Sequence, residues 1–196
     1  IEGYASLENR FTVRIIPNNK PAHTLQSKFI FIATGSRPYR PSEIPFDGWK
    51  IIDSEEIIRL NTIPRSMIIY GGGVIGCEYA CIYSSLGVKT TIIDSRPRIL
   101  QYLDSEVGKV LQDAMENLGV KFILNQKLEE INNKGSDVSI KIGNERLNAD
   151  ILFYAAGRVC SSEHIGLERL NINYDDRGAI QVNKNFQTSL PNIYAA

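Results

Sequence analysis

A glycine-rich hexapeptide at residues 71–76, Gly-Gly-Gly-Val-Ile-Gly, most constrains what this chain can fold into. An apolar run at 67–70 precedes it, and a helical pattern from 74 to 86 follows it and ends at Gly87. A second apolar run then covers 88–93. A strand, a glycine turn, a helix and a second strand in this order form a βαβ unit with parallel strands. We therefore expect an α/β fold with a Rossmann-like domain.

The spacing of the glycines favours a site for the pyrophosphate of a dinucleotide. Gly71 permits a tight turn, Gly73 lets the backbone approach a phosphate, and Gly76 lets the helix pack closely on the strand. Unpaired N–H groups and the macrodipole at the start of the helix attract anions. Such a motif can also be an ordinary structural turn, but the strand before it and the helix after it favour binding of NAD(H) or NADP(H).

Charged residues after the second strand predict how the adenosine ribose is held. Asp94 ends this strand roughly 20 residues after the glycines, where an acidic side chain accepts hydrogen bonds from the ribose. Its charge would repel the 2′-phosphate of NADPH, whereas the guanidinium groups of Arg96 and Arg98 can hold a phosphate bidentately. The alternative is that both arginines are solvated loop residues, and the direction of their side chains decides between the two interpretations.

The alternation of strands and helices continues beyond this unit. A helix over 104–118 can begin at a capping aspartate, and an apolar strand follows at 120–124. Alternating apolar residues at 138–142, followed by the turn pair Gly143-Asn144, indicate an inserted three-stranded antiparallel β-meander. The run at 151–157 then returns as a buried strand that ends in glycine.

The first fifty residues contain strand patterns and no helical pattern. Apolar runs at 11–16 and 29–33 are typical of buried strands. Residues 37–45 hold too many prolines for a helix or a central strand, which favours a crossover linker. We expect a domain boundary between Ile51 and Pro64.

Composition limits the partners of this chain. Its 22 basic and 22 acidic residues give a formal net charge of +0, so no global field attracts nucleic acid or an anionic membrane. No apolar run approaches the roughly 18 to 20 residues that span a bilayer. Three cysteines without Cys-x-x-Cys spacing and two separated histidines predict no metal site. We expect a cytoplasmic protein that binds small-molecule dinucleotides.

Three segments resemble the pyridine nucleotide-disulfide oxidoreductase flavoproteins, and the resemblance covers nearly the whole chain. Residues 32–38, Ile-Ala-Thr-Gly-Ser-Arg-Pro, resemble the segment that closes the FAD domain, and 155–158, Ala-Ala-Gly-Arg, resemble the motif that leaves the NAD domain. Residues 188–196 resemble the second FAD motif, which in the family continues with Gly-Asp. The resemblance implies partial FAD-domain segments at 1–55 and 171–196 on either side of an NAD(P)-binding domain at 56–170.

The same resemblance implies a central fragment of a larger FAD-dependent enzyme, truncated before the Gly-Asp pair. Such a fragment is expected to bind a nicotinamide dinucleotide, to be inactive by itself and to contain no catalytic residue. The full-length parent is expected to bind FAD as well as NAD(H) and NADP(H), and to form a homo-oligomer.

Within the family, residues 70–80 together with 35–41 and 52–54 are most similar to the enzymes that exchange hydride between NADPH and NAD+ through FAD. Val74 differs from the tyrosine that gates the nicotinamide pocket in glutathione reductase. An NAD-dependent disulfide reductase similar to dihydrolipoamide dehydrogenase is the alternative, because it shares the valine and an acidic residue at the position of Asp94. A third interpretation, a non-enzymatic nucleotide sensor, is disfavoured by the interrupted flavin motif.

The family resemblance also implies a role for Glu78, which matches a glutamate that pairs with a lysine beside the flavin. The alternative is a solvated helix glutamate, because that lysine is absent from this chain. The predicted cofactor-binding residues are Thr34, Gly35, Gly71, Gly73, Val74, Ile75, Gly76, Glu78, Asp94, Arg96, Arg98, Leu128, Ala156 and Gly157.

Overall fold

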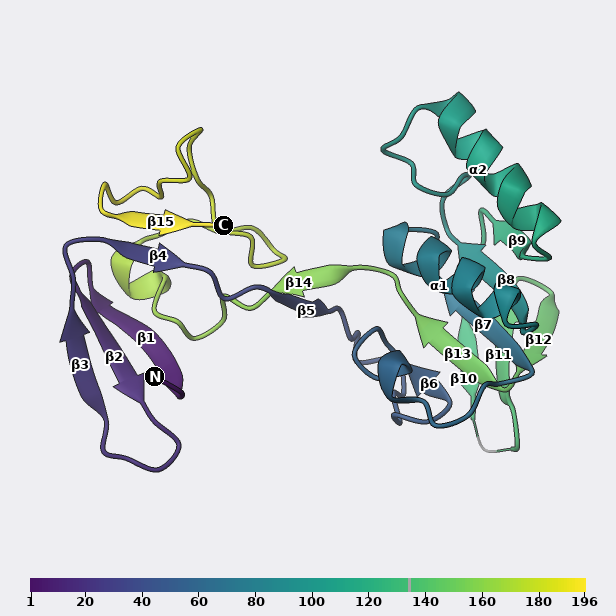
Figure 1. Ribbon diagram of the computed structural model, residues 1–196, viewed down its shortest axis with the longest axis horizontal. Coiled ribbons are helices and arrows are strands. Elements are labelled where there is room, and N and C mark those ends of the chain that lie inside the picture. The colour runs from purple at the N-terminus through teal and green to yellow at the C-terminus, as the bar shows by residue number, and fades with distance from the viewer. Residues whose placement is uncertain (134) are drawn as a thin grey trace. The chain divides into compact units, whose positions relative to one another are not determined.

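The computed structural model describes residues 1–133 and 135–196, and the chain divides into two compact units (Figure 1). One unit comprises Ile1–Arg37 and Arg158–Ala196, and the other comprises Pro38–Gly157. Each unit has hydrophobic clusters of its own.

The unit formed by Pro38–Gly157 is built on a five-stranded parallel sheet. Each neighbouring pair of strands runs parallel, so helices and an inserted sheet supply the crossover connections. The α/β fold predicted from the βαβ pattern is thereby confirmed. In spatial order the strands are β6 (Ile51–Ile52), β13 (Ile151–Tyr154), β7 (Ser66–Tyr70), β8 (Lys89–Asp94) and β9 (Lys121–Leu124).

Two helices, α1 (Val74–Ser85) and α2 (Ser105–Asn117), cover one face of this sheet. The sequence predicts both, and α2 begins where Asp104 accepts a hydrogen bond from the N–H of Glu106. Side chains alternate between the two faces of a strand, so one set of sheet residues meets the helices. The buried cluster on this face contains Ile69, Ile92 and Phe153 of the sheet with Cys77, Ala80, Tyr83 and Met115 of the helices.

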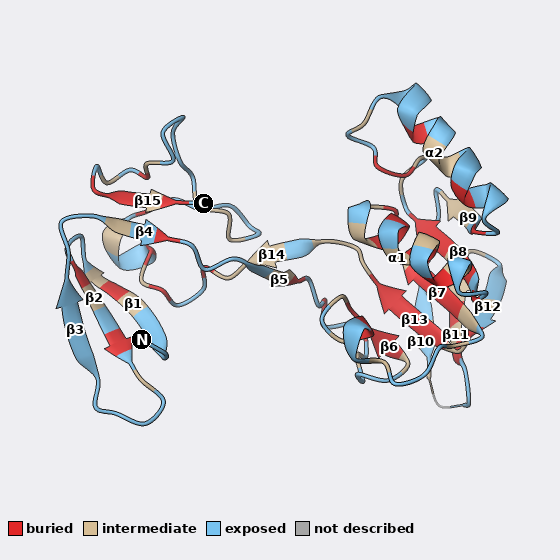
Figure 2. Cartoon of the chain, viewed as in Figure 1, coloured by how far each residue is buried: buried red, intermediate tan, exposed pale blue. Residues whose placement is uncertain are grey.

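A three-stranded antiparallel sheet packs on the other face. Its strands are β10 (Glu130–Asn132), β11 (Val138–Ile142) and β12 (Glu145–Ala149), and Gly143-Asn144 joins the last two. Because the parallel sheet is covered on both faces, its inner strands β13, β7 and β8 are mostly buried, whereas the edge strand β9 is exposed or half-buried (Figure 2). The cluster on this face contains Ile68, Ile93 and Leu152 of the parallel sheet with Val138, Ile140 and Ile142 of β11.

The regular elements of the other unit are short strands and one 3-10 helix, joined by turns and irregular segments. The antiparallel sheet contains β1 (Tyr4–Asn9), β2 (Thr12–Ile16) and β3 (His23–Gln26), and two strand pairs join segments from the two parts of the unit. Leu7, Ile32, Leu167, Ile172 and Ile193 are buried in its core. The strand pairs are β4 (Ile30–Ile32) with β15 (Ile193–Ala195), and β5 (Ser36–Pro38) with β14 (Arg158–Cys160); a 3-10 helix, η2, covers Glu168–Leu170.

The apolar run at 29–33 is less buried than its composition predicts. Phe29 and Phe31 are 65% and 59% exposed. Among the described residues, β4 pairs with β15 alone, and of its three residues Ile32 is buried. The stretch predicted as a linker and boundary also contains secondary structure. Ile51 and Ile52 form β6, are fully buried and pair with β13, and the 3-10 helix η1 follows at Ile57–Arg59. A two-residue strand is too short to give a periodic pattern in the sequence.

The chain passes from one compact unit to the other at Arg37/Pro38 and at Gly157/Arg158. The assignment of 1–55 and 171–196 to an FAD domain, and of 56–170 to an NAD(P)-binding domain, remains a prediction.

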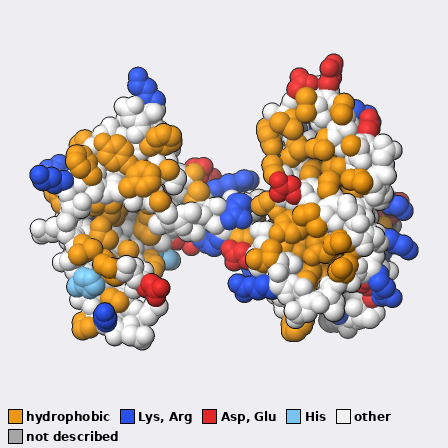
Figure 3. Space-filling model, in the orientation of Figure 1, with side chains coloured by type: hydrophobic (Ala, Val, Ile, Leu, Met, Phe, Trp, Pro, Cys, Tyr) orange, Lys and Arg blue, Asp and Glu red, His pale blue; other side chains and the backbone are white. Residues whose placement is uncertain are grey.

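Charges of both signs are mixed on the surface of the chain. In Figure 3, hydrophobic side chains appear on both units with basic and acidic side chains scattered between them. This mixture agrees with the formal net charge of +0. Within the described residues, no helix combines the length and the apolar character needed to cross a membrane.

The contact between α1 and the glycine turn gives a test of the fold. A Cβ atom at Gly76 would lie 1.9 Å from the carbonyl oxygen of Gly71, so we expect Gly76→Ala to lower the free energy of unfolding by about 3 kcal/mol or more. Gly108→Ala in α2 is the matched control, because its Cβ would meet only the Ile99 carbonyl at 3.9 Å. The free energy of unfolding of this control is expected to rise by up to about 1 kcal/mol, because alanine has a higher helix propensity than glycine. Equal unfolding free energies for the two variants in urea would contradict this packing.

Candidate functional site

The glycine turn lies at the carboxyl end of β7, where the ends of the two neighbouring strands meet it. The N–H of Gly71 donates to the carbonyl of Ile93 at the end of β8 (2.8 Å). On the other side, the N–H of Ala155, just after β13, donates to the carbonyl of Tyr70 (2.8 Å). Ligands of open parallel sheets bind at this edge, beyond the carboxyl ends of the strands. The sequence motif therefore stands where such a fold places its ligand.

Two of the three motif glycines are required by the fold. Gly71 has a φ of +118°, and a Cβ there would lie 2.7 Å from the Ala155 carbonyl oxygen. Gly76 lies against the carbonyl oxygen of Gly71. Gly73 differs, because its φ is −82° and a Cβ would meet no atom within 4 Å. The backbone thus has no need of glycine at 73, and the missing side chain leaves open space beside the helix.

The start of α1 has the features of an anion site. Gly73 is the N-cap of the helix, no side chain caps it, and no acidic residue lies in its first turn. The first N–H groups of any α-helix lack partners within the helix, and the helix dipole adds positive potential there. Local groups of this kind can hold an anion in a chain without net charge.

Asp94 ends β8 directly beside this turn, and its carboxylate is already occupied by donors from the protein. The side chain is 4% exposed. One oxygen, Oδ2, accepts from the N–H of Gly72 and from Nη2 of Arg96, both at 2.6 Å. The other, Oδ1, accepts from the backbone N–H (2.8 Å) and Nε (2.9 Å) of Arg96. A ribose hydroxyl can reach this carboxylate only if Arg96 moves.

The ionisation of Asp94 is maintained by these donors. Burial by itself raises the pKa of the carboxyl group, but the hydrogen bonds from Arg96 and Gly72 and the charge of Arg96 outweigh it. The net pKa of Asp94 is therefore below its ordinary value, and the group is a carboxylate at neutral pH. In turn, the hydrogen bond to Asp94 raises the pKa of Arg96.

The segment that follows Asp94 is fastened to the glycine turn through Gly72. The carbonyl of Gly72 accepts from the N–H of Leu100 (2.9 Å), while its N–H donates to Asp94. A Cβ at Gly72 would lie 2.9 Å from Ile99 Cγ2. The sequence motif does not predict a role for Gly72, because it gives a role only to the first, third and sixth positions of this hexapeptide. The signal it offers is the additional glycine between two motif positions.

The structure brings several of the predicted site residues together and leaves others apart. Gly71, Gly73 and Gly76 form the turn, and Asp94 and Arg96 are linked to it through Gly72. Arg98 is half-buried and donates to the carbonyl of Gln101 (3.3 Å), so it makes no contact with Asp94 within the described residues. On α1, Val74 and Glu78 are exposed and Ile75 is half-buried. Leu128 and Ala156 pack against the cluster on the meander side of the sheet, and Gly157 has a φ of +120°. Thr34 and Gly35 belong to the other unit.

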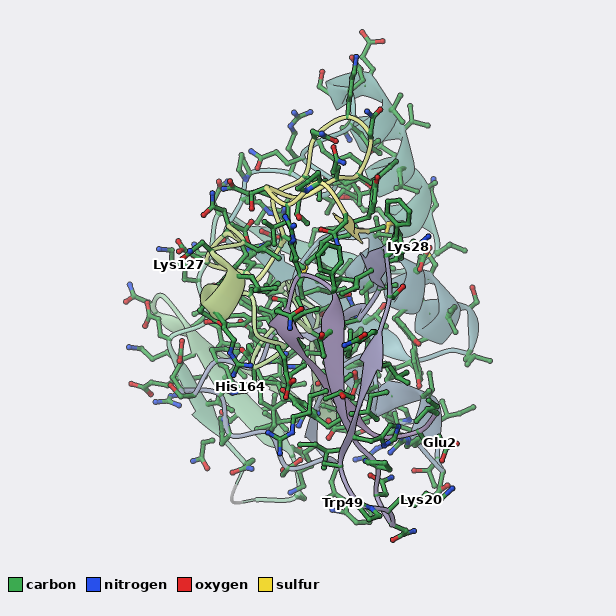
Figure 4. The ribbon with its side chains drawn as sticks, turned by 90° about the vertical axis from the view of Figure 1, so that its left-hand side faces the viewer. Glu2, Lys20, Lys28, Trp49, Lys127 and His164 are labelled. Carbon is green, nitrogen blue, oxygen red and sulfur yellow. The ribbon has the colours of Figure 1, made fainter. Side chains whose placement is uncertain are left out.

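Of the three free cysteines, Cys77 is buried and the other two, Cys81 and Cys160, are half-buried. Burial raises the pKa of Cys77 to about 12, so this thiol stays protonated at neutral pH. Both histidines are exposed, and His164 is labelled in Figure 4.

Comparison with known proteins agrees with the resemblance seen in the sequence. The family model described as pyridine nucleotide-disulphide oxidoreductase matches residues 4–196. The chain is similar to the soluble pyridine nucleotide transhydrogenases of Pseudomonas entomophila (strain L48), 38% identical, and Ectopseudomonas mendocina (strain ymp), 40% identical. Both alignments cover 99% of this chain and 42% of the relative, so the chain spans less than half the length of these relatives.

Solved structures show the same fold. The HOCl-induced flavoprotein disulfide reductase RclA from Escherichia coli superposes with a TM-score of 0.87 at 28% identity, over 100% of this chain and 44% of that chain. LpdA from Mycobacterium tuberculosis superposes with a TM-score of 0.92 at 23% identity, over the same shares of the two chains, and supports the fold alone.

The ion pair between Asp94 and Arg96 predicts that the free energy of unfolding of the chain depends on pH. Because the folded-state pKa lies below the ordinary value of 3.8, this carboxylate stabilises the folded chain above that pH and loses its contribution as the pH falls through the folded pKa. We expect Asp94→Asn to lower the free energy of unfolding at about pH 7, and the difference from wild type to shrink below about pH 4. Urea unfolding across this range measures it.

The control for this titration is Asp104→Asn, which keeps a good N-cap residue at the start of α2. Its free energy of unfolding should lie within about 0.5 kcal/mol of the wild-type value at neutral pH. If the difference between wild type and Asp94→Asn stays constant down to about pH 2, the ionised Asp94 does not stabilise the fold.

Proposed function

The chain belongs to the pyridine nucleotide-disulphide oxidoreductase family, and we propose that it carries the nicotinamide-coenzyme site of an FAD-dependent NAD(P)+ transhydrogenase. Such an enzyme transfers hydride between NADPH and NAD+ by way of FAD. The observation that carries the proposal is the open space at Gly73 beside the uncapped start of α1, at the carboxyl edge of the parallel sheet. Relatives named as soluble pyridine nucleotide transhydrogenases, 37 to 40% identical, support the activity.

Each part of the site has a distinct task in this proposal. The pyrophosphate lies over Gly73, held by the N–H groups of the first turn of α1. Val74, Ile75 and Glu78 lie on the nicotinamide side, and Asp94, Arg96 and Arg98 on the adenosine ribose side. Leu128, Ala156 and Gly157 complete the coenzyme contacts, and Thr34 and Gly35 contact FAD.

The flavin supplies the hydride transfer chemistry when it is bound. The residues of this chain bind the coenzyme by its phosphates, fix the distance of the nicotinamide from the helix and keep water away from it. Charge is supplied locally: the helix start favours the pyrophosphate, and the arginines after β8 favour a ribose phosphate.

A disulfide reductase is the second candidate. Likeness to RclA, which is named as a flavoprotein disulfide reductase, favours it, and so does the acidic residue at the end of β8. Such an enzyme needs a pair of cysteines a few residues apart beside the flavin. The full-length sequence distinguishes the two candidates by the presence or absence of that pair.

We further propose that the protein acts in the cytoplasm as a homo-oligomer with small-molecule dinucleotides as its partners. The balanced surface charge supports small ligands over nucleic acid.

The activity is tested directly on the protein expressed in full length. We expect a yellow protein with bound FAD that reduces thio-NAD+ with NADPH as the donor, followed by the absorbance of the reduced thionicotinamide. A protein that binds both coenzymes but reduces only a disulfide substrate would favour the second candidate. A protein that binds neither coenzyme would contradict the site itself.

The phosphate role of Gly73 is tested by Gly73→Val. The φ of −82° and the empty surroundings let valine fit the fold, whereas its side chain would occupy the space of the pyrophosphate. We expect NADH to bind at least about a hundredfold more weakly, with an unchanged circular dichroism spectrum. Gly135→Val is the control, because a Cβ there also meets no atom closer than 4.0 Å and lies in the loop between β10 and β11. Unchanged NADH affinity in Gly73→Val would contradict the phosphate assignment.

A further inference from the structure

We infer that Arg96 sets the coenzyme preference of this site in two ways, by presenting its guanidinium to a 2′-phosphate and by withholding Asp94 from a 2′-hydroxyl. The inference rests on the proposed dinucleotide site at the glycine turn. It makes Arg96 a specificity-determining residue, and it makes the Asp94–Arg96 ion pair the element that the two coenzymes affect differently.

The first step is that Asp94 has no acceptor capacity left. A carboxylate offers about four lone-pair positions, two on each oxygen. In Asp94, each oxygen accepts two hydrogen bonds, three of the four from Arg96 and one from Gly72. The side chain is also almost fully buried, so a ligand hydroxyl cannot add a fifth contact from outside. While the ion pair is closed, Asp94 is no ribose ligand.

The second step is that Arg96 keeps donors for an anion. Its side chain is 41% exposed, and only Nε and Nη2 contact Asp94. A guanidinium has five N–H donors in a planar fork, so its other edge remains able to donate to phosphate oxygens. Asp94 holds this fork in place from behind, and its negative charge is neutralised by the same contact. A 2′-phosphate therefore binds a guanidinium that is already held in position, and the charge of Asp94 is neutralised by the same ion pair.

The third step is the difference between the two coenzymes. NADPH can bind with the ion pair closed, because its 2′-phosphate uses the exposed edge of Arg96. NADH has a hydroxyl at that position, and it can use the carboxylate only after two charge-assisted hydrogen bonds to the guanidinium are broken. Arg96 thus lowers the affinity for NADH while it raises the affinity for NADPH. If the two residues acted as independent contacts, removing Arg96 would leave NADH binding unchanged.

Removing the guanidinium leaves Asp94 in a state suited to ribose. In Arg96→Ala, the carboxylate keeps the N–H of Gly72 and the backbone N–H of residue 96 and gains two free acceptor positions. We expect Arg96→Ala to weaken NADPH binding by about tenfold or more and to make NADH binding about threefold to tenfold tighter. Intrinsic fluorescence quenching and calorimetric titration of the full-length protein measure both affinities.

Arg98→Ala is the matched control. It removes the same charge from the same loop, two residues further on, but Arg98 contacts the Gln101 carbonyl and not Asp94. This variant is expected to weaken NADPH binding, as Arg96→Ala does, but not to make NADH binding tighter, because it leaves the Asp94–Arg96 ion pair closed. A general effect of loop charge would instead change NADH affinity equally in both variants and would overturn the inference.

A double-mutant cycle with Asp94→Asn isolates the pair. An asparagine side chain can still accept a hydrogen bond from the N–H of Gly72, but it carries no charge. Removing the guanidinium of Arg96 then gives the ribose hydroxyl only a neutral amide oxygen, which is a weaker acceptor than a carboxylate. In this background, Arg96→Ala should no longer tighten NADH. A gain in NADH affinity of the same size with and without the carboxylate would show that the gain does not come through Asp94.

The outcomes separate the inference from the proposed function. If wild type binds both coenzymes and Arg96→Ala binds NADH unchanged or more weakly, the inference is wrong and the dinucleotide site stands. If wild type binds neither coenzyme, the site itself is wrong. If Arg96→Ala does not fold, as judged by circular dichroism, Arg96→Gln replaces it, since glutamine keeps an amide donor near Asp94 without the charge. The same directions of change are expected for that variant, and their reversal overturns the inference.

Discussion

The close approach of α1 to the glycine turn is the contact on which the site depends. The turn places the carbonyl of Gly71 under the backbone of Gly76, and no side chain fits between them. This approach sets where the helix begins, and the start of the helix determines where unpaired N–H groups face the edge of the sheet. Two strand ends fix the turn from either side, through Ile93 and Ala155. The geometry of an anion site therefore follows from packing before any charged side chain is considered.

Electrostatics in this chain is local in origin. The sequence has no net charge, yet the carboxyl edge of the sheet combines a helix start with an arginine paired to a buried aspartate. A buried carboxylate is tolerated here because a guanidinium and two backbone N–H groups satisfy it. The same saturation makes Asp94 a support for its neighbours in this structure, with its ligand role dependent on the position of Arg96.

The sequence predicts the βαβ unit well, because each step has a clear physical signal. A buried parallel strand appears in the sequence as an apolar run, and many helices end at a glycine such as Gly87. Asp104 is a strong N-cap residue for α2. The short edge strand at Ile51–Ile52 gives no such signal, since two residues carry no period. The direction of the Asp94 and Arg96 side chains was equally invisible, because a spacing of two residues fits both an ion pair and two separate ligand contacts. Only the packing of the segment after β8 decides between them.

The double attachment of Gly72 has a consequence for how such sites can diverge. Its N–H donates to Asp94, its carbonyl accepts from the N–H of Leu100, and a Cβ at this position would collide with Ile99. The glycine turn and the segment after β8 are thus one structural block, although α1 and β8 separate them in sequence. Recombination or grafting that exchanges residues 94–100 alone would import a loop shaped for a different neighbour. A transplant that preserves the fit has to carry the second glycine along with the loop.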